Sequence, residues 1–302
     1  MSGRTYRVTG INLKGIPLGE SDRIIIILTR EQGLIRAVAK GARKQPSKLG
    51  GRMEPFVIND LLIAQGRWPT QADASQRLQR IAQAETLQSF PRLSRSLAHL
   101  TAAQYLAEVT LILALPEQTQ EDLFVLLVEH LERLEQASSD VKVLPLLTHG
   151  LYHLLALAGF APQVQACHYC RGRLAGGAFF SLNSGGMVCE PCRVAQRPNP
   201  ISWVSATVLQ ALGSLPNPTL PLSEDSLPLA AWLGAERLLR RILEHHAERE
   251  IRSAQLLASC YALALSEESA SLSNGQGSPD GGMTFPEEVV KVCIKIGKTI
   301  GE

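Results

Sequence analysis

Two pairs of cysteines, each separated by two residues, restrict the fold of this 302-residue chain more than any other feature. The pairs are Cys167 with Cys170 and Cys189 with Cys192. Two intervening residues let both thiolates of a pair face one point, and the second pair completes a tetrahedron. Because sulfur fills all four positions, the sequence predicts a structural zinc ion with no place for a reacting water. A redox motif or a disulfide is the alternative, although redox motifs usually carry a single such pair.

The segment between the two pairs has the pattern of a hairpin. Residues 178–182 and 185–188 are short apolar runs, and the turn-forming residues Asn183, Ser184 and Gly185 lie between them. We therefore expect a zinc-ribbon hairpin over residues 163–198. His168 lies inside the first cysteine pair, and we interpret it as a bystander and not as a further ligand.

The composition predicts a cytoplasmic protein with a sizeable core. With 45% hydrophobic residues, the chain can form two or three domains. We find no signal peptide and no apolar run near the ~20 residues of a membrane span. Cys260 and Cys293 stand alone among apolar residues, so we expect free, reduced thiols that suit a reducing compartment.

The net charge of +2 hides a strong segregation along the chain. Residues 1–80 carry 14 Lys/Arg and 6 Asp/Glu, a net +8, whereas residues 81–166 carry 4 and 9, a net −5. The cysteine segment 167–200 has 4 against 1, or +3, and residues 201–302 have 8 against 12, or −4. Positive charge gathered at the N-terminal part and the hairpin indicates a surface that binds polyanions.

The N-terminal part contains five runs of β type, separated by glycine- and proline-containing turns such as Gly15-Ile16-Pro17. The runs are 4–14, 22–29, 33–40, 56–64 and 78–85. Five short strands in this length predict a small closed barrel of the OB type. Residues 24–28 would also suit a buried helix, but their length and β-branching favour a strand. Residues 77–87 fit a helix as well as a strand, and the pattern leaves this open.

A basic segment lies between the third and fourth runs. Residues 40–52 hold five cations and no acidic residue: Lys40, Arg43, Lys44, Lys48 and Arg52. Their Gly, Pro and Ser neighbours predict a flexible surface loop whose cations can follow successive phosphates. Only Phe56 and Trp68 offer aromatic rings nearby, so we expect phosphate contacts with little sequence specificity. A solvated charged loop without a ligand is the alternative.

The N-terminal part resembles a known family. The matching segments, in order, are GESDR (19–23), TREQGL (29–34), AKGAR (39–43), SKL (47–49) and EPF (54–56). Their order and spacing are similar to those of the N-terminal domain of the DNA repair family RecO. The resemblance is strong over residues 5–65, weaker at the cysteine hairpin, and extends through about residue 265.

The resemblance implies a DNA-binding OB domain in a protein that anneals complementary strands. It also implies cooperation with RecR to load RecA where single-stranded-DNA-binding protein covers the DNA, and hence a nucleoid-associated protein. Carried onto matching positions, Lys40, Arg43 and Lys48 are the expected DNA contacts, with Lys44 and Arg52 beside them. Family members differ in whether they keep the four cysteines, and this chain keeps all of them.

The remainder of the chain is expected to be helical, so that the whole is an α+β protein of several domains. The helices expected from apolar periodicity are 93–115, a helix capped by Thr119, 141–159, 205–212, 229–248 and 251–265. We expect an OB domain over 1–88, a helical domain with the inserted hairpin over 89–265, and a disordered linker with a short amphipathic segment over 266–302.

A second binding surface is expected on the helix at 229–248. The family's cooperation with single-stranded-DNA-binding protein usually involves that protein's acidic, apolar-ended tail, which requires a hydrophobic pocket bordered by cations. Arg237, Arg240 and Arg241 lie there beside apolar residues. The adjacent His245 and His246 point to different sides of a helix, so we interpret them as surface residues.

The sequence offers little for catalysis. Glu20, Asp22 and Arg23 combine acid and base, but no histidine or nucleophile motif accompanies them, so a turn with ion pairing is the better interpretation. A zinc-dependent deaminase is excluded because its His-x-Glu and Pro-Cys-x-x-Cys signature is absent. We expect a non-enzymatic DNA-binding protein. A general RNA- or ribosome-associated zinc-ribbon protein is the alternative that an OB barrel and a ribbon would equally permit.

Overall fold

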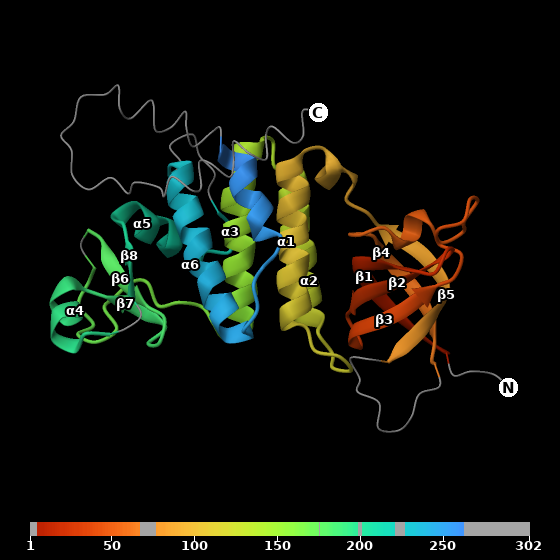
Figure 1. The fold of residues 1–302 in the computed structure, drawn as a ribbon, viewed down its shortest axis with the longest axis horizontal. Coiled ribbons are helices and arrows are strands. Elements are labelled where there is room, and N and C mark those ends of the chain that lie inside the picture. Colours follow the sequence, from red (N-terminus) through yellow and green to blue (C-terminus); the bar gives the residue numbers. More distant parts are fainter. Residues whose placement is uncertain (1–4, 67–76, 175, 199–200, 221–226, 263–302) are drawn as a thin grey trace.

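The computed structural model describes residues 5–66, 77–174, 176–198, 201–220 and 227–262. A β-barrel lies at one end of the molecule, a helical bundle in the middle, and a small sheet with the cysteine segment at the other end (Figure 1). The amphipathic segment predicted at the C-terminus, the linker before it and Cys293 lie outside the described residues. No described helix is long and apolar enough to span a bilayer.

The barrel confirms the predicted OB-type fold. Its strands are β1 (Thr5–Leu18), β2 (Asp22–Thr29), β3 (Gly33–Ala39), β4 (Ile58–Ala64) and β5 (Leu78–Gln88). The sheet closes in the order β1-β2-β3-β5-β4, and β1 pairs with both β2 and β4. All pairs are antiparallel except β3 with β5.

Alternating burial explains why the isoleucine-rich run forms a strand and not a helix. Ile25 and Ile27 of β2 are fully buried in the barrel core, whereas Ile24 and Ile26 between them are half-buried on the outside. Period two is the period of a strand, so successive side chains reach opposite faces of the barrel wall. The ambiguous segment at Leu78 is also a strand, because it pairs with both β3 and β4.

The first strand is longer than predicted, and the turn expected at Gly15-Ile16-Pro17 is absent. These residues continue β1, and Pro17 lies opposite Arg23 of β2. A bulge between Asn12 and Lys14 bends the strand, which lets its second half stay paired with β2. The chain reverses instead at Gly19, which has a φ of +59°.

The helical part is built from α1 (Leu97–Leu113), α2 (Glu121–Gln136), α3 (Asp140–Leu157), α5 (Ala206–Ser214) and α6 (Leu229–Ala247). A short 3-10 turn (Pro91–Ser94) precedes α1, and residues 254–262 are helical at the end of the described chain. Helix α3 is central, since it packs against α1, α2 and α6. Its end at Gly159, which has a φ of +83°, follows the prediction.

The capping residue predicted for α2 was wrong. The residue before α2 is Gln120, and no side-chain hydrogen bond caps this helix. The hydroxyl of Thr119 donates instead to the carbonyl of Glu31, 3.3 Å away, in the turn between β2 and β3. Thr119 therefore does not cap α2 but links the start of this helix to the barrel. Ser205, by contrast, caps α5 by accepting a hydrogen bond from the amide of Val208.

One apolar core runs through the barrel base and the helical bundle. Ile11, Leu28 and Phe56 from the barrel belong to the same buried cluster as Leu93 and Phe124 of the helical part. The barrel interior forms a second, separate cluster. A shared core of this kind fixes the orientation of the barrel on the bundle, so the basic loop and the cysteine segment stand at opposite ends of the molecule (Figure 1).

Candidate nucleic-acid interface and metal centre

The basic segment between β3 and β4 is held at its start by the side chain of Asp22. This carboxylate accepts a hydrogen bond from the amide of Gly41 at 2.8 Å, and the amide of Arg43 donates to the carbonyl of Ser21 at 3.0 Å. The hydrogen bond from Gly41 lowers the pKa of Asp22, and the neighbouring Lys40 and Lys44 contribute to the shift. Asp22 thus positions the start of the loop.

Two buried asparagines hold the end of the same segment. The amide groups of Asn12 and Asn59 both donate to the carbonyl of Arg52, at 2.8 and 2.9 Å, and Asn12 also donates to the carbonyl of Glu54. Met53 is fully buried in the barrel core beneath the loop. Buried polar and apolar anchors therefore hold both ends of the predicted loop and fix where its cations emerge.

The five predicted cations are all exposed, and four of them border one hollow on the barrel. The hollow has a volume of about 710 Å³, and Lys40, Lys44, Lys48 and Arg52 line it from the loop side. Residues of β4 and β5 form the opposite wall. We call this hollow the basic groove. Among the described residues, no carboxylate lies within ion-pairing distance of its three lysines.

The predicted cation Arg43 does not line the basic groove. It lines a smaller hollow of about 400 Å³ with Arg23 and Lys44, and its guanidinium donates to the carbonyl of Gly19 at 2.9 Å. Arg23 forms an ion pair with Glu54 at 2.7 Å. Lys44 lines both hollows, so the positive surface continues from one to the other.

Sequence reasoning missed one cation of the groove. Arg7 of β1 lines the groove and pairs with Asp60 of β4 at 2.6 Å. Arg7 and Asp60 lie on the paired strands β1 and β4, and no local pattern in the sequence indicates that they are neighbours. The Arg7 side chain is exposed, so the pair costs little to open.

Phe56, one of the two aromatic residues considered from the sequence, does not line the groove. Phe56 is buried, with 5% of its surface exposed, and packs in the core between barrel and helices. Trp68 lies outside the described residues. None of the described residues that line the groove is aromatic. Among the described residues, the groove therefore presents cations without an aromatic ring on which a base could stack.

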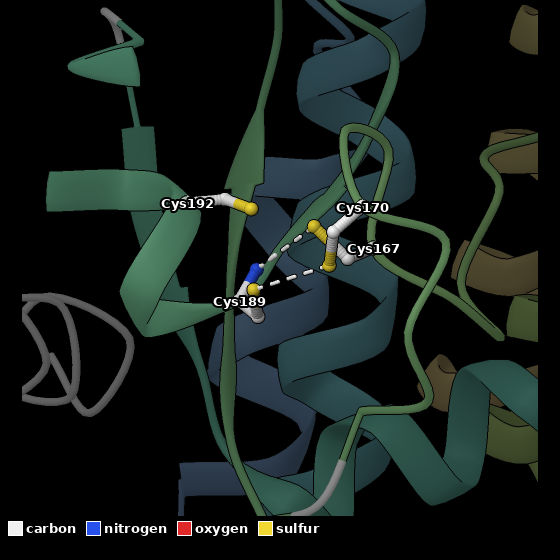
Figure 2. Close-up of side chains that lie close together, drawn as sticks. All are labelled: Cys167, Cys170, Cys189 and Cys192. Atoms are coloured by element: carbon white, nitrogen blue, oxygen red, sulfur yellow. Dashed lines mark hydrogen bonds between the residues drawn. The ribbon is translucent and has the colours of Figure 1, made fainter. Parts of the chain in front are cut away.

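The four cysteines converge at the other end of the molecule (Figure 2). Cys167 and Cys170 lie in the loop after α3, Cys189 directly precedes α4 (Glu190–Gln196), and Cys192 lies in α4. All four sulfurs lie within 4.8 Å of one another, and those of Cys170 and Cys189 are 3.7 Å apart. Sulfurs bound to one zinc at about 2.3 Å in a tetrahedron lie about 3.8 Å apart, so the group can hold a metal ion.

The backbone around Cys167 favours the thiolate of this residue. The amide of Cys189 donates to the sulfur of Cys167 at 3.4 Å. Although burial raises the pKa of Cys167, hydrogen bonds from backbone amides, that of Cys170 first, lower it to about 6. The neighbouring sulfurs raise the pKa of Cys192 to about 12. Four thiolates so close together repel one another, and a bound cation removes that repulsion.

The hairpin around the cysteines is present and is larger than predicted. β6 (Ala178–Ser181) and β7 (Gly186–Val188) form the expected antiparallel pair. β8 (Ile201–Val204) adds a third strand beside β6. His168 is not part of the cysteine group, as expected. The extra strand was not foreseen because its four residues carry no alternating pattern of their own.

The three arginines proposed for a partner site differ in their surroundings on α6. Arg240 donates to the buried carboxylate of Glu236 at 3.0 Å and lies 3.7 Å from that of Glu244. Arg237 is half-buried, and this burial lowers its pKa. Arg241 is exposed. Of the three arginines, only Arg241 is fully exposed, and it forms no ion pair with a buried carboxylate among the described residues. His245 and His246 are exposed, as expected.

Comparison with known proteins covers almost the whole chain. Residues 1–90 match the family model described as "Recombination protein O N terminal", and residues 94–255 match "Recombination protein O C terminal". A protein of Synechococcus sp. (strain JA-2-3B'a(2-13)), named DNA repair protein RecO, is 76% identical over 95% of this chain and 97% of its own length. Proteins of the same name from Gloeobacter violaceus and Nostoc sp. are 46% and 41% identical; each alignment covers 86% of this chain, and 95% and 97% of those proteins.

Proposed function

Because the chain belongs to the RecO family of recombination and DNA-repair proteins, we propose that it binds single- and double-stranded DNA and anneals complementary strands. The observation that carries the proposal is the basic groove, in which four loop cations and Arg7 surround one hollow on an OB barrel. Cations spaced along a groove neutralise successive phosphates without reading bases. Annealing needs this property, because every complementary pair of strands must be accepted.

Annealing makes and breaks no covalent bond, so the proposed function requires no catalytic residue. A cationic surface lowers the repulsion between two approaching phosphate backbones and thereby raises the rate at which strands meet. We propose that the protein is not an enzyme and that its contribution is electrostatic. With RecR, it helps to load RecA on DNA covered by single-stranded-DNA-binding protein, and it works in the cytoplasm on the nucleoid.

For the metal centre we propose one structural zinc ion, held by Cys167, Cys170, Cys189 and Cys192. Four sulfur donors at tetrahedral spacing favour zinc over harder cations. Zinc links the loop after α3 to the start of α4 and so stabilises the small sheet between them. It supplies no reactive water, because sulfur occupies all four positions.

We also propose that the tail of single-stranded-DNA-binding protein docks on α6 beside Arg237, Arg240 and Arg241. Arg240 is engaged with Glu236, so Arg241 is the residue that tests the site without disturbing a buried ion pair. Fluorescence anisotropy should give micromolar affinity for the tail peptide, weakened by salt and by Arg241→Glu. Arg249→Glu, an exposed charge reversal beyond the helix, is the control. Equal effects of the two variants would place the site elsewhere.

The central experiment is strand annealing. Labelled complementary DNA strands, with and without bound single-stranded-DNA-binding protein, are mixed with the wild-type protein or with a variant carrying Ala at Lys40, Arg43 and Lys48. We expect the variant to lose most of the acceleration in both conditions. Annealing by the variant at the wild-type rate would refute the groove as the DNA site. RNA of the same sequence bound more tightly than DNA would favour an RNA-directed function instead.

A further inference from the structure

Three histidines that are far apart in sequence converge between α2 and α3. His130 lies on α2, and His149 and His153 lie one helical turn apart on α3. Their ring centroids are 5.3, 5.2 and 4.1 Å apart, and one nitrogen from each ring lies within 4.8 Å of the others. Two histidines at i and i+4 on one helix form a known zinc-binding arrangement when a third ligand joins them. Here the third ligand comes from the neighbouring helix.

Hydrogen bonds fix how two of these rings are oriented. Nε2 of His149 lies 2.8 Å from the carbonyl oxygen of Asn217, and Nε2 of His153 lies 2.9 Å from that of Leu215. A carbonyl can only accept, so both Nε2 atoms carry the proton and both Nδ1 atoms keep a lone pair. Backbone carbonyls that orient metal-binding imidazoles in this way are common in metalloproteins.

The third ring is buried without a hydrogen-bond partner. His130 has 1% of its surface exposed, and among the described residues neither of its ring nitrogens finds a donor or acceptor. An unsatisfied buried polar group destabilises a fold, and a buried imidazole retained in this state calls for an explanation. Gly150 makes room for the ring, since a Cβ at this position would lie 3.1 Å from Cγ of His130.

Burial lowers the pKa of all three rings, which favours the neutral form that a metal ligand requires. Burial, together with repulsion from the other two rings and from Arg133, lowers the pKa of His130 to about 2. Burial likewise lowers the pKa of His149 to about 4, despite the hydrogen bond to Asn217 and the nearby Glu129. A divalent ion therefore has no proton to displace from these rings.

We propose that His130, His149 and His153 form a second metal site, which binds Zn²⁺ through three imidazole nitrogens and joins α2 to α3. Nitrogens bound to one zinc at about 2.0–2.1 Å in a tetrahedron lie about 3.4 Å apart, so small side-chain rotations close the present spacing. Three imidazoles suit zinc better than calcium or magnesium, which prefer oxygen. This site has no sulfur donor and is separate from the cysteine site.

Arg133 borders the triad and opposes cation binding. Its NH1 lies 3.2 Å from Nδ1 of His149, and its NH2 donates to the carboxylate of Glu129. Zinc must replace the guanidinium at Nδ1, while Glu129 retains Arg133 at the surface. The arginine thus lowers the affinity of the site, and removing its charge is expected to raise zinc affinity roughly tenfold.

Metal content of the full-length protein tests the site. After saturation with zinc and removal of unbound metal, the wild-type protein and the control His245→Gln should carry two zinc ions per chain. His153→Gln should carry one, and so should Cys189→Ser, which keeps the triad. One zinc in the wild-type protein, unchanged in His153→Gln, would overturn the proposal. None of these readouts depends on DNA binding, so they are independent of the proposed function.

A second test measures zinc affinity in a variant that keeps all three histidines. Zinc affinity is measured by competition with a chromophoric chelator in two proteins. One is Cys189→Ser, which keeps Arg133, and the other carries Arg133→Gln in addition. The proposal requires roughly tenfold tighter binding without the arginine charge. An affinity that fails to rise would contradict it, even if His153→Gln proved too unstable to purify. Circular dichroism at each zinc concentration checks that the helices are retained.

Discussion

Gly33 of the barrel lies directly against the backbone of Leu115 in the helical part. The amide of the next residue, Leu34, donates to the Leu115 carbonyl at 3.1 Å. A Cβ on Gly33 would come within 2.3 Å of that same oxygen and 2.4 Å of the Gln118 carbonyl. Because both obstacles are backbone atoms, they cannot rotate away, and the contact holds barrel and helices in one orientation.

Gly33→Ala is therefore expected to destabilise the protein by about 2–4 kcal/mol, through the φ of +62° and the clash together. Gly19→Ala is the matched control, since Gly19 has a φ of +59° but open space around it, and should cost about 1 kcal/mol. Urea denaturation measures both. Equal losses would show that the contact with Leu115 contributes nothing.

Salt dependence measures how many phosphates the basic groove and its border neutralise. Replacing Lys40, Arg43 and Lys48 by Ala should make the slope of log affinity against log salt shallower by about two to three units, because each phosphate contact contributes about 0.9. The effect should be the same for every DNA sequence. Ala at Lys142, Arg249 and Arg252, three exposed cations of the helical part, serves as the control and should leave the slope unchanged.

Loss of the cysteine site should act locally. Cys189→Ser removes a ligand, so residues 167–192 should exchange their amide hydrogens faster, while DNA affinity stays within about twofold. The barrel has its own apolar core and does not depend on the metal. Cys260→Ser is the control, since this cysteine lies 3.8 Å from the hydroxyl of Thr101 and outside the group. A collapse of DNA binding in Cys189→Ser alone would contradict a local role.

The fold could be predicted where local pattern and tertiary structure agree. Alternating burial of Ile25 and Ile27 follows directly from the strand period, and the four cysteines follow from their spacing. Prediction was wrong where strand pairing or a distant contact overrode a local signal. Thr119 has the pattern of a helix cap, but its hydroxyl bonds to Glu31 of the barrel. Pro17 suggests a turn, but a bulge earlier in β1 keeps it paired with β2.

The sites show the same division. The five loop cations were visible in the sequence as a run. That four of them line the basic groove while Arg43 lines the neighbouring hollow depends on how Asp22 and Asn12 anchor the loop. The spacing of His149 and His153 was also visible in the sequence. Their third partner was not, because His130 belongs to another helix and only packing brings it close.

The histidine triad makes stability depend on pH in the metal-free protein. Both His130 and His149 have a folded pKa far below the value of about 6.5 in the unfolded chain. Above pH 6.5 neither state binds these protons, so their contribution to stability is complete. As the pH falls below 6.5, the unfolded chain takes up protons that the folded protein refuses, and stability is lost until the folded pKa is reached.

Between pH 7 and pH 5 this loss should amount to about 1–2 kcal/mol for each of the two histidines. Urea denaturation in the presence of a chelator measures it, and His149→Gln should remove about half of the triad's share. His245→Gln is the control, because this exposed ring lies outside the triad. Added zinc should oppose the loss in the wild-type protein, since it binds only the neutral rings. A wild-type pH profile identical to that of His149→Gln would show that the buried rings are protonated as readily as free histidine.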